Sequence, residues 1–165
     1  MLRVYCFDTL AVTVEDVYLR EPDPQRGGDE RGVRVELRPL AAPPWQGSPN
    51  ASQPLACGPA LWRADLLESV AGGPGTKDRM HHHPGMSGGE PGPRVFVPAL
   101  TADPILWLRD RLADVTPMLE AARVTDAASH KAAVAALRDA APELAEIVGT
   151  VLGEVRAGRL ATSGH

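Results

Sequence analysis

Three consecutive histidines, residues 81–83, form the part of this sequence whose residue types and spacing most clearly suggest chemistry. If the segment is a β-strand, alternate side chains point to the same face, so His81 and His83 share one face and His82 occupies the other. Two neutral imidazoles on one face can bind a single divalent transition metal. The pattern therefore predicts that His81 and His83 are metal ligands and that His82 is not.

A glycine-rich segment after the histidines leads to a carboxylate that could complete the site. Residues 84–89 read PGMSGG, a composition typical of a chain reversal, and Glu90 follows directly. We therefore expect Glu90 to return beside His81 and His83 as a third ligand. Two histidines and one carboxylate with open coordination positions form the ligand set of non-haem iron sites. The expected cofactor is a divalent ion, either Zn, Fe, Ni or Mn.

The spacing of these residues resembles the first sequence motif of the cupin family. Gly75 is followed, after five residues, by His81-x-His83 and then, after six more, by Glu90, a longer final gap than the cupin motif usually has. A second cupin motif does not follow in the chain. The resemblance implies a small β-barrel whose two histidines and glutamate bind a divalent metal at the barrel mouth.

The segment PALWRADLLESV, residues 59–70, fits two secondary structures. As a helix it would begin near Pro59 and stop at Gly72, whereas as a strand it places Arg63 and Asp65 on one face. We favour the strand, because strand-like segments lie on both sides of it in the sequence. Asp65 is then a candidate for a further metal ligand beside the histidines. Arg63 and Asp65 together are candidates for a pocket-lining pair or for a structural ion pair.

Two differently patterned regions predict an α+β protein. Residues 1–98 contain most of the prolines and glycines and show strand-type alternation, most clearly in GVRVELRPL at 32–40. For this region we expect an antiparallel β-sandwich or a small cupin-like barrel. Residues 99–160 show helical periodicity and predict three to four helices that pack on the β-rich domain, the last of them beginning at Pro142. The apolar stripe of that helix could also form the seam of a homodimer.

The proline-rich segment 42–59 is expected to be an ordered, extended crossing. Its tryptophan, Trp45, should dock on the body of the protein, and Trp62 and Trp107 should also anchor the core. The two cysteines, Cys6 and Cys57, are expected to be buried free thiols, because nothing in the sequence indicates an oxidising compartment.

Composition excludes several classes of partner. Acidic residues number 21 and basic residues 17, a poor fit for nucleic acid, which selects a concentrated basic surface. The chain has no apolar run of about 18 residues, so we expect no membrane span. Asp8 interrupts the only apolar stretch near the start, which favours a cytoplasmic protein without a signal peptide. The abundance of Ala, Arg, Gly and Pro suggests a bacterial source.

The functional prediction is therefore a small cupin-like protein that binds a divalent metal and a small molecule through His81, His83 and Glu90. A metal-free pocket, a pH-responsive segment and a plain exposed His/Gly/Pro loop stay open as other interpretations of the histidines. The corresponding alternative function is a non-catalytic module that binds a small molecule or another protein without metal. The residue pattern does not specify a reaction, so whether the protein is an enzyme also stays open.

Overall fold

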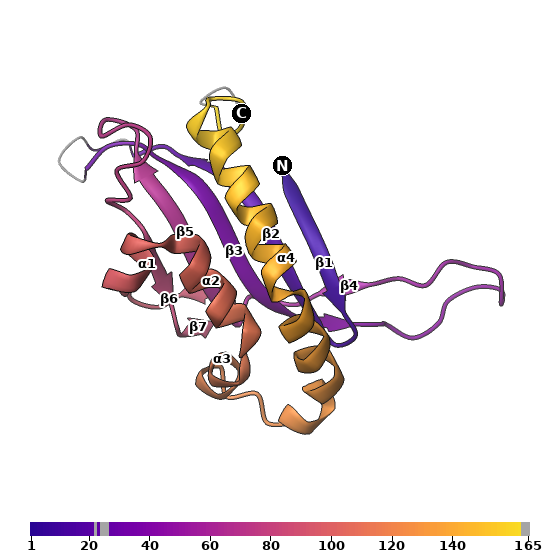
Figure 1. The fold of residues 1–165 in the computed structure, drawn as a ribbon. Coiled ribbons are helices and arrows are strands. Elements are labelled where there is room, and N and C mark those ends of the chain that lie inside the picture. The colour runs from indigo at the N-terminus through magenta and orange to yellow at the C-terminus, as the bar shows by residue number, and fades with distance from the viewer. Residues whose placement is uncertain (22, 24–26, 163–165) are drawn as a thin grey trace.

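The computed structural model describes residues 1–21, 23 and 27–162 (Figure 1). A six-stranded antiparallel sheet has the order β1-β2-β3-β5-β6, with the short β4 paired to the end of β3. The strands β7 and β8 form a separate two-stranded hairpin. The strands are β1 (Leu2–Phe7), β2 (Leu10–Leu19), β3 (Glu30–Ala41), β4 (Ala56–Cys57), β5 (Trp62–Ser69), β6 (His81–His83), β7 (Met86–Ser87) and β8 (Glu90–Pro91).

The helices follow the sheet along the chain. They are α1 (Pro98–Ala102), α2 (Pro104–Ala113), α3 (Thr116–Ala121), a short 3-10 helix η2 (Ala127–His130) and α4 (Lys131–Arg156). The side chain of Asp103 caps α2 by accepting a hydrogen bond from the backbone N–H of Leu106 at 3.0 Å. The last helix differs from the expectation, because α4 passes unbroken through Pro142 instead of beginning there. Its buried residues from Ala133 to Val155 form one continuous apolar stripe, and packing of that stripe outweighs the hydrogen bond that proline cannot donate.

The helices cover one face of the sheet and build the hydrophobic core with it (Figure 1). Helix α4 contacts β1, β2 and β3, and it also packs along α2. Val35, Leu37 and Leu66, which alternate along the central strands, are completely buried in this core. The predicted α+β class, with an antiparallel sheet followed by C-terminal helices, is therefore confirmed. None of the helices in the described residues is both long and apolar enough to cross a membrane.

The predicted barrel or sandwich is not confirmed. Within the described residues, β1 and β6 end the sheet without pairing to each other, so the sheet stays open. After β6 the chain makes the small β7–β8 hairpin, returns to β6 through the single His82–Val95 bridge, and then becomes helical. The helices, and not a second sheet, cover the apolar face of the sheet.

Residues 59–70 and the tryptophans give a mixed outcome. The strand prediction for 59–70 is confirmed by β5, which pairs with β3 on one side and β6 on the other. Trp62 and Trp107 are buried in the core as expected. Trp45 does not dock on the body: it is 48% exposed and its indole N–H donates to the backbone carbonyl of Ser48 within its own loop. The loop that holds Trp45, between β3 and β4, extends away from the sheet (Figure 1). The two cysteines, Cys6 and Cys57, are exposed, whereas the sequence predicts that they are buried.

The face of the sheet opposite the helices, which we call the open face, has a different composition. In the described chain no helix covers it (Figure 1). It carries the alternate residues of the same central strands, which are ionisable: Arg34, Glu36, Arg63, Asp65, His81 and His83. The candidate functional site lies among them.

Candidate metal centre

The pairing of β5 with β6 brings a carboxylate beside the two histidines. Asp65 lies directly opposite His81, and Arg63 lies opposite His83. Directly opposed residues share a face of the sheet, so all three possible ligands, Asp65, His81 and His83, converge on the open face. They are 2%, 1% and 4% exposed, respectively, which is unusual burial for ionisable side chains.

The ligand atoms of these residues form a small triangle. The Nε2 atoms of His81 and His83 are 3.1 Å apart, and Asp65 Oδ2 is 3.5 Å from the first and 3.4 Å from the second. With metal–ligand bonds of about 2.1 Å, such separations correspond to ligand–metal–ligand angles of about 95° to 113°. These angles lie within the range of octahedral to tetrahedral coordination. The triangle could therefore hold one ion without rearrangement of the strands.

The outer nitrogen of each imidazole fixes which nitrogen faces the triangle. His81 Nδ1 is 2.7 Å from the carbonyl oxygen of Arg79, and His83 Nδ1 is 2.7 Å from that of Gly92. A carbonyl can only accept, so each Nδ1 carries a hydrogen and donates it. Each neutral ring then presents the lone pair of Nε2 to the triangle, as in histidines that bind metals.

Asp65 is oriented by a residue from the neighbouring strand. Arg34, directly opposite Asp65 on β3, donates from Nε to Asp65 Oδ1 at 2.8 Å. The other carboxylate oxygen, Oδ2, is thereby directed to the histidine pair. One charge-assisted hydrogen bond thus sets the position of the third ligand atom.

Burial also favours the neutral form of His81. It lowers the pKa of His81, an effect that the carbonyl of Arg79 and the charge of Asp65 oppose and that the charge of Arg94 reinforces. A lowered pKa means that His81 loses its proton more readily than a solvated histidine. The neutral imidazole is the form that binds metal.

His82 faces the helices, as strand alternation predicts. Its ring lies 5.2 Å from the Trp107 ring and 6.3 Å from the Trp62 ring. Burial, followed by the charge of Arg111, lowers the pKa of His82 to about 4. It is therefore a neutral side chain at the core boundary, on the opposite face from the Asp65, His81 and His83 triangle.

The structure does not bring Glu90 to the histidines. The predicted chain reversal does form, but as the closed hairpin β7–β8, in which Ser87 pairs with Glu90. Because the hairpin pairs with itself and not with β6, Glu90 is carried to an exposed position. Among the described residues, the only group of three or more possible ligands close enough to share an ion is Asp65, His81 and His83.

Arg63 and Asp65 do not form a pair with each other. Arg63 Nε donates to Glu36 at 2.7 Å, and Arg38 Nε donates to the same carboxylate at 2.9 Å. Arg63 therefore belongs to a structural ion-pair group beside the triangle, while Asp65 is bound by Arg34. Sequence reasoning missed the role of Arg34, although the alternation of arginine and glutamate at 34–38 was the available signal.

Comparison with known proteins leaves the site to be interpreted from its own geometry. Scans against protein-family models, curated proteins and solved structures each found no match to this chain. The pairing of His81 with His83 agrees with the cupin-like motif, whereas the carboxylate comes from Asp65, which lies before the histidines in the chain. Membership of the cupin family stays a prediction.

Proposed function

We propose that Asp65, His81 and His83 bind one divalent transition-metal ion and that the protein uses this ion to bind a small molecule. The observation that carries the proposal is the convergence of three lone pairs. Both imidazoles donate outward through Nδ1, so in their neutral forms they direct their Nε2 lone pairs, together with Asp65 Oδ2, into the triangle. Buried acceptors at 3.1 to 3.5 Å repel one another unless a cation lies between them.

A transition metal fits better than calcium or magnesium. Two of the three ligand atoms are imidazole nitrogens, which bind Zn, Fe and Ni well, whereas calcium and magnesium select oxygen. Structural zinc sites usually have four protein ligands, whereas three ligands leave a position for water or another small molecule. A metal ion at such a site can polarise an oxygen that it binds, which is the chemistry the centre would supply.

Isothermal titration of the chelator-treated full chain with ZnCl2 tests the proposal. We expect one equivalent of Zn²⁺ to bind, and we expect the single variants Asp65→Asn, His81→Ala and His83→Ala to lose at least about tenfold in affinity. Glu90→Gln serves as the matched control, because it removes an exposed carboxylate from the neighbouring hairpin. Circular dichroism would establish that each variant is folded.

Two results would count against the metal site. The wild-type chain could fail to bind Zn²⁺, Fe²⁺, Ni²⁺ or Mn²⁺ with one-to-one stoichiometry, or binding could survive a combined His81→Ala/His83→Ala substitution. The first result would indicate that a shared proton, rather than a metal, separates the three acceptors. The second would place the ion elsewhere.

The exposed loop between β3 and β4 favours a second candidate function, a protein-interaction module. Trp45 is 48% exposed and Leu55 is 65% exposed, and the segment that holds them extends from the body (Figure 1). Contact with another protein would remove this apolar surface from water, which is favourable. Sedimentation velocity over a concentration series tests a second copy of this chain as the partner. Self-association that a Trp45→Ser/Leu55→Ser variant abolishes would support it, and a monomer at every concentration would contradict it.

A further inference from the structure

A short strand-like segment beyond β6 places two more side chains beside the triangle. His82 and Val95 form an antiparallel bridge, with backbone hydrogen bonds of 3.0 and 2.9 Å in the two directions. In an antiparallel register, this bridge sets Arg94 opposite His83 and Phe96 opposite His81. Both residues therefore belong to the open face, at the side of the metal ligands away from Asp65.

Arg94 is held differently from the other arginines near the triangle. Arg34 and Arg63 donate to carboxylates at 2.8 and 2.7 Å, and their side chains are 21% and 13% exposed. Arg94 contacts Glu30 at 3.5 Å, and its side chain is 47% exposed. Glu30 is also approached by a second arginine, Arg79, at 3.8 Å. The guanidinium of Arg94 is therefore free to exchange this long contact for a better anionic partner.

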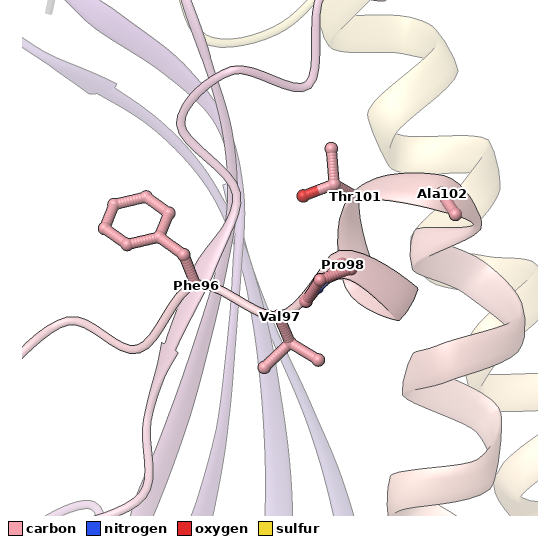
Figure 2. A pocket seen from close by; sticks show the side chains of 5 residues that line it. All are labelled: Phe96, Val97, Pro98, Thr101 and Ala102. Atoms are coloured by element: carbon pink, nitrogen blue, oxygen red, sulfur yellow. The ribbon is translucent and has the colours of Figure 1, made fainter.

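Phe96 adds an apolar surface next to the same ligands. Its ring centre lies 5.5 Å from that of His81, and the residue is 58% exposed. Figure 2 shows its ring on one side of the chain, with Pro98 and Thr101 of α1 on the other side. Phe96 lines a shallow groove with Val97, Pro98, Thr101 and Ala102. An aromatic ring therefore lies beside one of the proposed metal ligands.

The charge of the loaded centre favours an anion. A divalent ion and the Arg34 guanidinium outweigh the single negative charge of Asp65, so the centre is cationic once metal is bound. The charge of Arg94, which acts on His81, adds to this field. A carboxylate has two oxygens that can be divided between an ion and a guanidinium.

We propose that the site binds a small monocarboxylate with a short apolar group. One carboxylate oxygen binds the metal, the other pairs with Arg94, and the apolar group packs against Phe96. This proposal rests on the proposed metal site, and it goes beyond it by naming the class of ligand. Arg94 acts here as a binding residue that selects for negative charge, and Phe96 selects for apolar substituents.

Visible spectroscopy of the Co²⁺-loaded full chain tests this ligand class, with isobutyrate as the probe and isobutyramide as its neutral isostere. We expect isobutyrate to change the cobalt absorption bands saturably and isobutyramide to leave them unchanged at equal concentration. Arg94→Gln should raise the dissociation constant of isobutyrate about tenfold or more, because a charge-assisted hydrogen bond is lost. Arg94→Lys should restore part of the affinity, and Phe96→Ala should weaken binding about threefold.

Arg109→Gln is the matched control, since Arg109 is 48% exposed and pairs with its sequence neighbour Asp110 on α2. It should bind isobutyrate as the wild type does. The ligand class would be overturned if isobutyrate left the cobalt bands unchanged, or if the Arg94→Gln variant bound isobutyrate with wild-type affinity. Neither result would contradict the metal site. A chain that binds no Co²⁺ would overturn both proposals, so the two failures are distinguishable.

Discussion

Both faces of the central sheet contain buried side chains, but the side chains are buried by different means. On the helix-covered face, Leu66 is 0% exposed because it packs in the hydrophobic core. One residue earlier on the same strand, Asp65 is 2% exposed on a face that no helix of the described chain covers. Burial of an apolar side chain is favourable, whereas burial of a carboxylate is costly unless partners compensate for it.

The partners on the open face fall into two kinds, and the difference is informative. Glu36 is bound by two arginines, Arg63 and Arg38, which satisfy it with opposite charge. Asp65 has one arginine, and its other oxygen faces the Nε2 atoms of His81 and His83. The first group is satisfied by its own opposite charges, and the second is where we propose that a cation binds. The open face thus combines a structural part with a part that we assign to ligand binding.

The largest change in the free energy of unfolding should come from a substitution in the core, on the helix-covered face. Leu66→Ala should lower the free energy of unfolding by about 2–5 kcal/mol, through lost apolar burial and the cavity that remains. Urea unfolding followed by circular dichroism measures it. A loss well under 1 kcal/mol would mean that the helices do not pack on this face as the structure has them.

Metal should stabilise the chain through the open face. Zinc at about a hundred times its dissociation constant should add about 2.7 kcal/mol to the free energy of unfolding, because only the folded chain assembles the three ligands. The gain should shrink as pH falls, since protons compete with zinc for the imidazoles. Thermal unfolding with and without zinc measures it at several pH values. An equal zinc effect in Asp65→Asn would contradict the assignment.

The ion-pair group should contribute less than the core. Glu36→Gln removes the charge shared by Arg63 and Arg38 and should lower the free energy of unfolding by about 1–3 kcal/mol, because two arginines lose their partner. Denaturant unfolding of the metal-free chain gives the value. Zinc affinity should change little, since Glu36 is outside the triangle. A selective loss of zinc binding with unchanged stability would reverse the roles given to the two groups.

The smallest expected effect concerns the residue that sequence analysis favoured as the third ligand. Glu90→Gln should leave both stability and zinc affinity within experimental error, because the side chain is exposed on the β7–β8 hairpin. Calorimetry and thermal unfolding of the same samples are sufficient. A tenfold weaker zinc affinity in this variant would show that Glu90 reaches the ion after all.

Local patterns predicted the parts of the site that depend on one strand. The alternation of residues 81–83 separates His82 from its neighbours, and the flanking strand-like segments favour a strand at 59–70. Given that strand, Asp65 was a candidate ligand. Glu90 was favoured because a glycine-rich turn suggested a return to the same strand, but turn composition does not determine which strand the returning segment pairs with.

The parts that depend on pairing across the sheet could not be read from one sequence. Arg34 orients Asp65 only because β3 and β5 pair in the register that sets them opposite each other. The unbroken α4 likewise depends on packing against the sheet, which overrides the local preference of Pro142 for a helix start. Trp45 illustrates the converse: an apolar residue does not dock when its loop leads away from the core.

Anomalous diffraction at the zinc absorption edge, from crystals of the zinc-loaded chain, would test the central claim most directly. We expect a single strong peak about 2.0–2.2 Å from His81 Nε2, His83 Nε2 and Asp65 Oδ2. A peak at Glu90 or at His130, or no peak within the triangle, would contradict the metal centre proposed for this protein.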